Sequence, residues 1–394
     1  MIVNDPVKVF QSKYPDALEV NKTYVPYRVC PIGAHSDHQH GKILGFAIDK
    51  GVNLVYSIRD DSLVVLDSLD FSGSTVFDIH SIPDKQGNWG DYARAVAFAL
   101  QKKYDIEYGI EGIVAGSLPV GGLSSSAAVC LCYLNALASA NDIKLSNTEL
   151  IELSYIAEKE YVGINVGTLD MSCEVLCEKD KLLYLDTQND RYELINKPDT
   201  AEDFLIAIIY SGVSRHLSSG FNMRVDEVRT AAYSLKAYAD LPYGLFEDTR
   251  LREVPIEVYM QYKDRLPYNM RKRAEHFYTE FQRVEKGAEL FKQGDIKGFG
   301  KLVFESGYSS IYNWETGSSP LISIYSIMTK TEGIYGGRFS GAGFNGCCVA
   351  LVDPSYTESI KESITKEYLA EFPEYTNTFS IHYCKTDNGL GIHI

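Results

Sequence analysis

The chain has 394 residues, a formal net charge of −15, and hydrophobic and charged fractions of 45% and 23%, which is enough chain for two domains at about 150 residues each. The acidic balance argues against nucleic acid as a partner, because binding a phosphate backbone needs a basic face. The eight cysteines form no C-x-x-C pair and most stand among apolar residues, so we expect free thiols in a reducing, cytoplasmic compartment.

The first part of the chain is expected to consist of strands separated by turns. Residues 1–6 lack a basic stretch followed by an apolar run, which argues against a signal peptide. Val52–Ile58, Leu63–Leu66 and Gly112–Ala115 are short apolar runs of the strand type. The apolar stretch Ala127–Ala140 is too short to span a bilayer, so we expect no membrane partner.

The strand at Gly112–Ala115 leads into a glycine- and serine-rich run, P-V-G-G-L-S-S-S-A-A, at residues 119–128. Such a loop before a buried helix exposes unpaired backbone N–H groups, to which the helix dipole adds positive potential. Together they form a seat for phosphate, although the same letters also suit an ordinary turn and helix cap. No lysine follows the glycines, so a metal ion held by a serine hydroxyl is the natural group to offset the phosphate charge.

Two acidic residues downstream are candidates for chemistry. Residues 146–149 read S-N-T-E, which is a capping box, and they open a helix that carries Glu158. A second helix is expected to start near Thr168 and to carry Asp170. Taken alone, Glu158 is compatible with a solvated residue on a charged face, and Asp170 with a helix N-cap.

The second part of the chain begins beyond a polar segment at residues 190–203, where we place the domain boundary, with an apolar strand at Phe204–Ser211. Later apolar residues recur at helical spacing and predict a helix with one buried face, namely Phe277, Phe281, Val284, Ala288 and Phe291. The basic start of this helix, Arg271–Arg273, is interpreted as a solvated face. The glycine-rich segment Gly336–Gly346 precedes an apolar strand, Cys347–Val352, and predicts close approach of the backbone to a ligand or another segment.

Residues 27–40 are dense in polar groups, with three histidines, His35, His38 and His40, and Asp37 within six residues. The cluster invites a zinc site and hence a metal-dependent hydrolase, but its spacing matches no standard set of zinc ligands. Histidine, aspartate and glutamine side chains supply directional donors and acceptors for hydroxyl groups. We therefore favour hydrogen bonding to a polyhydroxylated ligand, with the hydrolase kept as an alternative.

Taken together, these segments resemble the GHMP small-molecule kinases and, within that family, the galactokinase branch. The motifs of that branch are close to G-R-V-N-L-I-G-E-H-T-D-Y, G-L-S-S-S-A and G-A-G-F-G-G-C. Here they read Y-R-V-C-P-I-G-A-H-S-D-H, G-L-S-S-S-A and G-A-G-F-N-G-C, in the same order. The resemblance implies a two-domain α+β fold, with residues 1–200 and 201–394 as the N- and C-terminal kinase domains and the active site in the cleft between them.

The resemblance also implies roles for single residues. Asp170, in the run G-T-L-D-M, matches the catalytic aspartate of G-I-M-D-Q, and Arg28 matches the arginine beside it. Ser125 matches a magnesium ligand, and Glu158 matches a second one because it precedes the aspartate by twelve residues. His35 and Asp37 match sugar-binding positions. The nucleotide-binding positions are Gly121, Gly122, Leu123, Ser124, Ser125, Ser126, Gly341 and Gly343.

The chemistry of these residues is coherent without the family. Phosphoryl transfer to a hydroxyl needs an aligned acceptor, a metal ion on the phosphates and a group that takes the proton. Asp170 would orient and deprotonate the acceptor hydroxyl. A neighbouring Arg28 would keep that carboxylate ionised and would stabilise charge on the transferring group.

The first motif departs from galactokinase at Ala34, where that branch has a glutamate which, by the resemblance, binds the hydroxyl at carbon 6 of galactose. Alanine removes a negative charge and opens space, and both changes favour a substrate with a carboxylate at carbon 6. The version G-A-H-x-D-H-Q resembles the galacturonokinase relatives of galactokinase. Phe221 matches a sugar-contacting tyrosine in a slightly gapped segment, and His38 and Arg224 are candidates to pair with the carboxylate.

We therefore expect an ATP- and Mg²⁺-dependent kinase that phosphorylates the anomeric hydroxyl of D-galacturonate. A galactokinase acting on D-galactose is the alternative. A catalytically inactive sugar sensor is a further one, but such a protein should have a broken phosphate loop or lack the aspartate, and this chain keeps both. We expect a monomer or a small homo-oligomer with a small-molecule sugar or uronic acid as its substrate.

Overall fold

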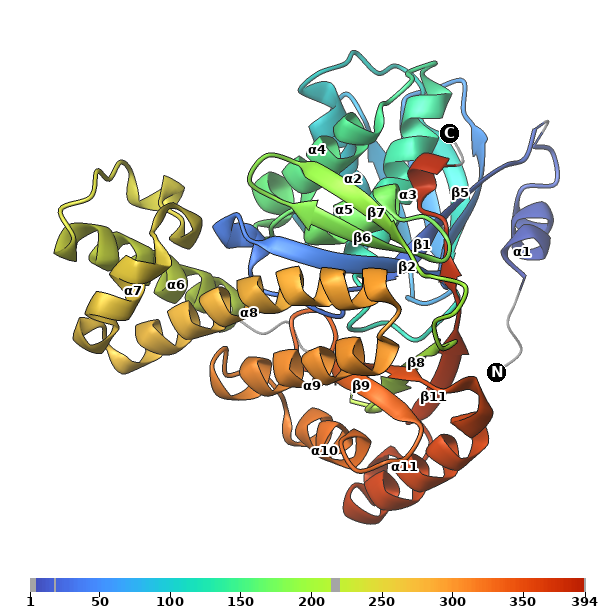
Figure 1. Ribbon diagram of the computed structural model, residues 1–394. Coiled ribbons are helices and arrows are strands. Elements are labelled where there is room, and N and C mark those ends of the chain that lie inside the picture. Colours follow the sequence, from blue (N-terminus) through green and yellow to red (C-terminus); the bar gives the residue numbers. More distant parts are fainter. Residues whose placement is uncertain (1–4, 18, 214–219, 393–394) are drawn as a thin grey trace.

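The larger of the two sheets is organised around one long strand. In the computed structural model, which describes residues 5–17, 19–213 and 220–392, this strand is β2 (Lys42–Ile58). The strand order is β4-β3-β5-β2-β6-β7, and β1 and β12 also pair with β2. Figure 1 labels β1, β2, β5, β6 and β7 of this sheet. The other strands of this larger sheet are β1 (Asn21–Val29), β3 (Leu63–Ser68), β4 (Ser74–Asp78), β5 (Ile110–Gly116), β6 (Lys181–Asp186), β7 (Arg191–Asn196) and β12 (Thr386–Asp387).

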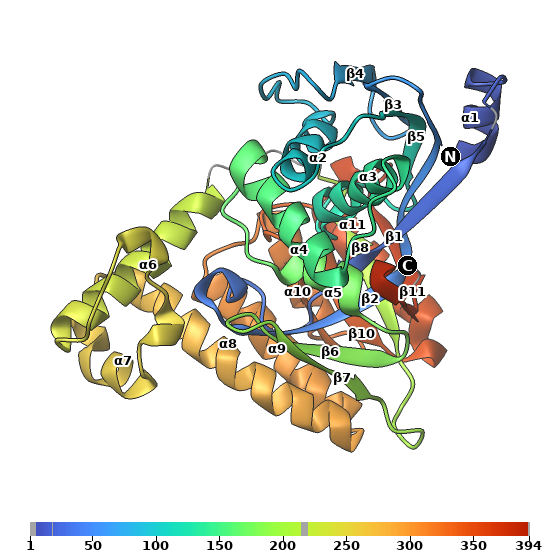
Figure 2. The ribbon, with the colours of Figure 1, turned by 90° about the horizontal axis from the view of Figure 1, so that it is seen from above.

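Helix α3 (Ser125–Ala140) is the central helix on this sheet and contacts β1, β2 and β5. The apolar residues of α3 occupy all of its faces, which is the pattern of a helix enclosed by a core. Most of the residues of α3 are buried. Figure 2 shows the helices that gather around it. They are α2 (Asp91–Gln101), α4 (Asn147–Ile156) and α5 (Leu169–Leu176), while α1 (Pro6–Lys13) packs at the outer edge. The three strands expected in residues 52–115 and the capping box before α4 are confirmed.

The second sheet has four antiparallel strands in the order β11-β8-β10-β9. They are β8 (Leu205–Tyr210), β9 (Ile334–Phe339), β10 (Cys347–Val352) and β11 (Ser380–Cys384). α9 (Ile296–Tyr312), α10 (Ser319–Met328) and α11 (Thr357–Glu371) cover this sheet. α9 approaches β9 so closely that a Cβ atom on Gly336 would overlap the backbone of Gly300.

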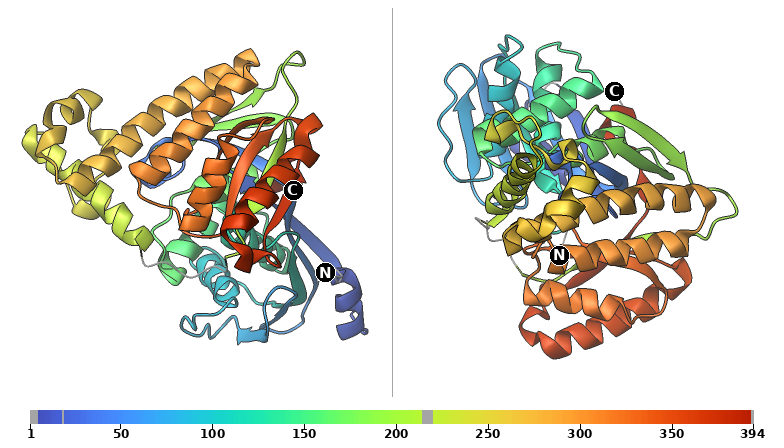
Figure 3. Two further views of the ribbon diagram at one scale, coloured as in Figure 1. Left: turned by 90° about the horizontal axis from the view of Figure 1, so that it is seen from below. Right: turned by 60° about the vertical axis from the view of Figure 1, so that its left-hand side comes forward.

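One long helix, α8 (Tyr268–Gln293), joins the parts of the molecule. It lies beneath β2, β6 and β7 and packs along α9 (Figure 1). Its first turns pack with α6 (Gly220–Tyr238) and α7 (Ile256–Tyr262) in a helical extension that projects from the rest of the molecule (Figure 3). The helical periodicity over residues 277–291 is confirmed, since Phe277, Val284 and Phe291 are buried.

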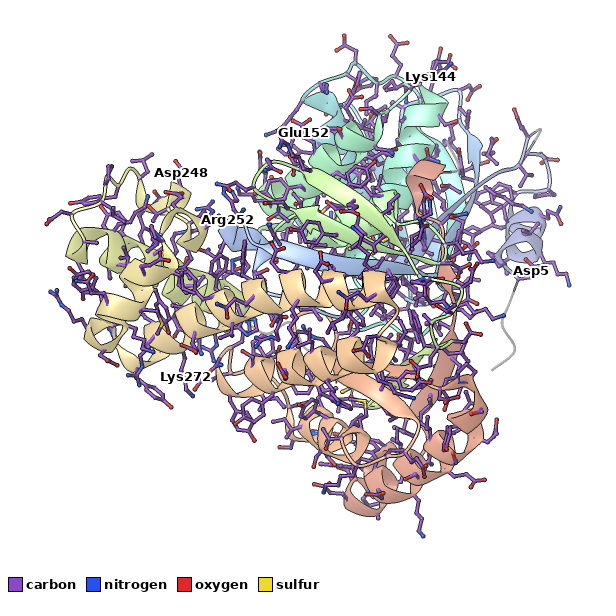
Figure 4. All side chains as sticks on the ribbon, viewed as in Figure 1. Asp5, Lys144, Glu152, Asp248, Arg252 and Lys272 are labelled. Carbon is purple, nitrogen blue, oxygen red and sulfur yellow. The ribbon has the colours of Figure 1, made fainter. Side chains whose placement is uncertain are left out.

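The interpretation of Arg271–Arg273 as a solvated face is wrong for Arg273. This side chain is buried and pairs with Glu227 and Glu315, with nitrogen–oxygen distances of 2.7 Å to each. Lys272, at the outer end of α8 (Figure 4), also pairs with Glu315 at 2.8 Å. A charged side chain can be buried when partners satisfy it, and those partners come from segments that the local sequence does not reveal.

The chain passes from the first sheet to the second between β7 and β8. This connection lies within and just after the polar segment at residues 190–203. The last strand, β12, returns to the first sheet by pairing with β2. The division into residues 1–200 and 201–394 therefore stays a proposal about domains. Within the described residues, no helix is long and apolar enough to cross a bilayer.

Candidate active site

The glycine-rich, aspartate and histidine-rich segments meet at one cavity of about 250 Å³. Its walls come from both sheets and from the helices beside them. One end is lined by Gly121, Gly122, Ser124, Ser125, Ser126 and Gly341, and the other by Ala34, His35, Asp37, Phe221 and Asn222. Arg28, Glu158 and Asp170 also line it. We call these the glycine–serine end and the histidine end.

The glycine–serine end is the loop between β5 and α3, so the expected order of strand, loop and buried helix is confirmed. Gly121 and Gly122 have φ angles of +138° and +86°, and Ser124, just before α3, has φ +56°. These left-handed conformations bend the chain so that it enters the helix directly at Ser125. The first-turn N–H groups of α3 have no partner within the helix, which suits this end of the cavity to an anion.

A second glycine-rich loop lies against the first one. A Cβ atom on Gly341 would stand 3.1 Å from the Cα of Gly122, and one on Gly346 would stand 2.8 Å from the carbonyl carbon of Gly121. The two backbones can approach this closely because these residues have no side chains. The predicted close approach of the segment Gly336–Gly346 is confirmed, and the segment that it meets is the first glycine loop.

Arg28, on β1, connects three of the segments that form the cavity. Its guanidinium is buried and donates to Asp170 Oδ1 at 2.7 Å, to Ser340 Oγ at 3.4 Å, and to Ser124 Oγ. Burial by itself would lower the pKa of Arg28, but the charge and hydrogen bond of Asp170 raise it above its ordinary value. The arginine therefore stays charged and fixes the position of Asp170.

Both simple alternatives for the acidic residues are wrong. Asp170 is not the N-cap of α5, because that position belongs to Thr168, and its carboxylate accepts from Arg28 instead. Glu158 is not on a solvated face, because it is 1% exposed. It lies in a π-helical segment, η2 (Ala157–Val162), that follows α4, and such segments recur at functional sites.

At the histidine end, the loop between β1 and β2 presents Ala34, His35 and Asp37 to the cavity. The His35 ring stacks on Trp314, with 5.0 Å between ring centroids and an interplanar angle of 8°. Among the described residues, none is hydrogen bonded to a ring nitrogen of His35. Asp37 accepts from the Leu169 N–H at 3.3 Å, and a side chain on Gly167 would collide with it. The glycine before the Asp170 helix is thus explained by the approach of Asp37.

Burial shifts the pKa values at the histidine end. It lowers the pKa of His35 well below its ordinary value, and the positive charges of Arg338 and Arg28 act in the same direction. Burial and the nearby Asp170 carboxylate raise the pKa of Asp37 to about 6. At neutral pH, His35 is therefore neutral and Asp37 is ionised.

Several predicted site residues lie outside the lining of the cavity. His38 packs one layer behind it, edge-on to Phe221, and Leu123 is part of the core. Arg224 donates to the carbonyl oxygens of Trp314 and Glu315 at 3.1 and 3.4 Å. Gly343 is turned toward Thr316. Residues 215–219, which precede the Phe221 match, lie outside the described part of the chain.

The zinc alternative gains no support from the part of the chain that the structure describes. There, no group of three or more histidine, cysteine, aspartate and glutamate residues is placed to hold a metal ion. His35 and His38 instead pack against the same ring, that of Trp314.

Sequence reasoning missed part of the lining and the layer behind it. Asn222, Phe344 and Asn345 face the cavity. The last two belong to the third motif, G-A-G-F-N-G-C, of which only Gly341 and Gly343 are predicted site residues. Trp314 and His276, which pack around His35, lie far from the first motif in sequence. No local pattern marks Trp314, whereas His276 is a lone histidine on the buried face of α8 and is a signal for a buried polar contact.

Comparison with known proteins is consistent with this geometry. Residues 91–178 match the family model of the GHMP kinases N terminal domain, and residues 288–370 match that of the GHMP kinases C terminal domain. A galacturonokinase of Arabidopsis thaliana is 38% identical, with 94% of this chain and 92% of the relative covered. A galactokinase of Pyrococcus furiosus is 31% identical over 93% of this chain and 98% of its own.

Among solved structures, the galactokinase of Lactococcus lactis in complex with galactose superposes with a TM-score of 0.88 and 27% identity, covering 97% of each chain. The similarity extends over both sheets and all three motifs, and it agrees with the α+β fold expected from the sequence. The chain therefore belongs to the GHMP kinase family, as a sugar-kinase-like member whose glycine loops, aspartate and histidine segment meet in one cavity.

Proposed function

We propose that this protein is an ATP-dependent sugar-1-kinase whose substrate is D-galacturonate. The observation that carries the choice of substrate is Ala34, a methyl group in the wall of the histidine end. By the resemblance of the first motif, galactokinases have a carboxylate at this position. A galacturonokinase is among the relatives that cover nearly the whole chain. Galactokinases are among them too, so the retained His35 and Asp37 support D-galactose as the alternative substrate.

The glycine–serine end is proposed to bind the phosphates of ATP. Backbone N–H groups at the start of α3 and the hydroxyls of Ser124, Ser125 and Ser126 supply donors there. The wall of the same cavity also holds the Ser125 hydroxyl and the buried Glu158 carboxylate, two hard oxygen ligands of the kind Mg²⁺ takes beside phosphate oxygens. These residues fit a magnesium ion, which when bound would offset the charge of the phosphates.

Asp170 is proposed to act on the acceptor hydroxyl. Its side chain is 24% exposed, and it lines the cavity between the two ends, where a sugar hydroxyl would meet the terminal phosphate. Arg28 holds one carboxylate oxygen at 2.7 Å and leaves the carboxylate able to accept the hydroxyl proton. The same guanidinium, which also reaches Ser124 of the glycine–serine end, would stabilise negative charge on the transferring group.

The histidine end is proposed to hold the sugar ring and its carboxylate. Asp37 would accept hydrogen bonds from ring hydroxyls, and Phe221 would pack on an apolar face of the ring. With alanine at position 34, a carboxylate at carbon 6 has space beside His35 and meets no glutamate.

A side-by-side kinase assay tests the proposal. The purified protein would be given ATP, Mg²⁺ and either D-galacturonate or D-galactose, and the sugar 1-phosphate would be quantified. We expect a higher kcat/KM for galacturonate. A clear preference for galactose would favour the alternative, and no turnover with a panel of hexoses and uronic acids would favour the inactive sensor.

Cellular location and assembly belong to the proposal as well. We place the protein in the cytoplasm because all eight cysteines are free and buried thiols, which suits a reducing compartment. We expect a monomer or a small homo-oligomer. Sedimentation of the purified protein would measure its size directly.

A further inference from the structure

The loop that carries Ala34 and His35 has an unusual backbone. Gly33 has φ +106° and His35 has φ +63°. The left-handed region is costly for a residue with a side chain and persists where the surroundings enforce it. His35 and Asp37 reach the cavity from this loop. Other groups must therefore hold its backbone in the left-handed conformation.

Two residues of α8 hold the loop through its backbone. The Gly33 N–H donates to Glu280 Oε1 at 2.7 Å, and His276 Nε2 donates to the Ala34 carbonyl at 3.0 Å. Since a carbonyl oxygen can only accept, the hydrogen of His276 is on Nε2, and Nδ1 accepts from the Ser309 hydroxyl at 2.9 Å. Both side chains are completely buried.

Glu280 is held as a buried carboxylate by cations from two elements. Arg283, on α8, pairs with its Oε2 at 2.6 Å, and Arg338, on β9, lies 3.4 Å from its Oε1. Although burial alone would raise the pKa of Glu280, these charges together with His276 and Ser306 lower it to about 2. A charge this deep is costly to bury unless it is paired and hydrogen bonded, and this carboxylate has both kinds of partner.

The Glu280 carboxylate also links the loop that carries Ala34 and His35 to the second glycine-rich segment. Arg338 also donates to the Phe339 carbonyl at 3.0 Å, and the next residue, Ser340, accepts from Arg28 at 3.4 Å. Glu280 thus stands between the histidine end and the strand that leads to the glycine–serine end. His276, by contrast, is hydrogen bonded to Ala34 and Ser309 and, within the described residues, to no part of the glycine loops.

We propose that His276 and Glu280 are positioning residues that set the backbone of Gly33 and Ala34, and so determine how the sugar is held. Neither His276 nor Glu280 is among the described residues that line the cavity. Their effect on sugar binding therefore passes through the loop. The inference rests on the proposed function only in that the histidine end binds the sugar. It does not depend on which sugar is the substrate.

The test uses the KM for sugar and the KM for ATP of four variants. His276→Phe keeps the ring shape and removes the donor to Ala34, and His276→Gln restores an N–H at a similar reach. Glu280→Gln removes the charge and keeps an acceptor for Gly33. Phe291→Leu is the matched control, because Phe291 is buried on the same helix but packs on Phe46, Phe204 and Phe299.

We expect His276→Phe to raise the sugar KM about tenfold, since small displacements of binding groups have large effects, and to leave the ATP KM within about twofold. His276→Gln should recover most of the loss. Glu280→Gln should raise the sugar KM at least as much, and Phe291→Leu should change neither KM more than about twofold. In His276→Phe, a parallel rise in both constants or a normal sugar KM would overturn the inference, and so would the absence of rescue in His276→Gln.

The outcomes separate this inference from the proposed function. If the wild-type enzyme prefers galactose, the proposed substrate fails and the same variants are compared with galactose. If Glu280→Gln does not fold, the His276 pair still decides. If the wild-type protein phosphorylates no sugar, calorimetric titration of the sugar into the same variants replaces the KM, with the same ratios expected.

Discussion

One end of the cavity is formed mainly by backbone, and the other is formed mainly by side chains. The glycine–serine end consists of backbone and small side chains, with two glycine loops in direct contact. The histidine end consists of aromatic rings, a carboxylate, an amide and one alanine. In the proposed function, the end made of backbone binds the phosphates that nucleotides share, whereas the end made of side chains can change its partner with one substitution.

The difference also concerns what fixes each end. At the glycine–serine end, the absence of Cβ atoms fixes the geometry, and any added atom must displace a neighbour. At the histidine end, bonds from α8 fix it through Glu280 and His276. Substitutions should therefore affect the donor at one end and the acceptor at the other, with Asp170 between them affecting the reaction itself.

The largest effect is expected for Asp170→Asn. Asparagine keeps the size of the side chain but cannot take the proton of the acceptor hydroxyl, and general-base catalysis typically contributes about 10²- to 10⁴-fold. We expect kcat to fall at least about 1000-fold while ATP binding, measured by calorimetry, stays within a few fold. Turnover near the wild-type rate would show that Asp170 is not the base.

The next effect concerns the histidine end alone. Ala34→Glu places a carboxylate where we put that of galacturonate, and juxtaposed like charges cost several kcal/mol. We expect kcat/KM for galacturonate to fall about 100-fold and that for galactose to rise. Ala34→Gln is the matched control, with nearly the same volume and no charge, and it should lose far less with galacturonate. Equal losses in both variants would mean that space rather than charge sets the preference.

Local patterns were sufficient for the first end and insufficient for the second. The strand before residues 119–128, the glycines and the apolar helix after them lie in one continuous segment, so this order of strand, loop and buried helix could be predicted from neighbouring residues. The capping box before α4 is similarly local. The support of the histidine end depends instead on His276, Glu280 and Trp314, which reach the loop through tertiary packing alone.

The error at Arg273 has the same physical origin. Three basic residues in a row suggest a solvated face, but the helical period places Arg273 on the buried side, one turn before Phe277. Its carboxylate partners, Glu227 and Glu315, come from α6 and from the segment after α9. Charge pairing between distant segments cannot be read from one stretch of sequence.

A smaller effect should appear at the glycine–serine end with Gly122→Ala. The residue has φ +86°, and a Cβ atom would stand 2.7 Å from Cys347 Sγ. The added atom would displace Cys347, which follows the second glycine loop, and small displacements of binding groups have large effects. We therefore expect the ATP KM to rise about tenfold and the sugar KM to stay nearly constant. The control is Gly163→Ala, with φ +83° and no atom within 4 Å of the added Cβ. If both variants behave alike, strain rather than the contact between the glycine loops is responsible.

The smallest effect is a pH dependence confined to the histidine end. The pKa of Asp37 is raised to about 6 by burial and by Asp170, so Asp37 becomes protonated as the pH falls through 6 and then accepts fewer hydrogen bonds from the sugar. For one such group, kcat/KM for the sugar should fall about fourfold between pH 8 and pH 5.5. At saturating sugar, kcat/KM for ATP should lack this fall, because bound sugar keeps Asp37 ionised. Asp37→Asn should bind sugar more weakly and remove the pH difference between the two substrates. A fall of the same size for ATP and for sugar would place the titrating group outside the histidine end and would weaken the separation of the two ends.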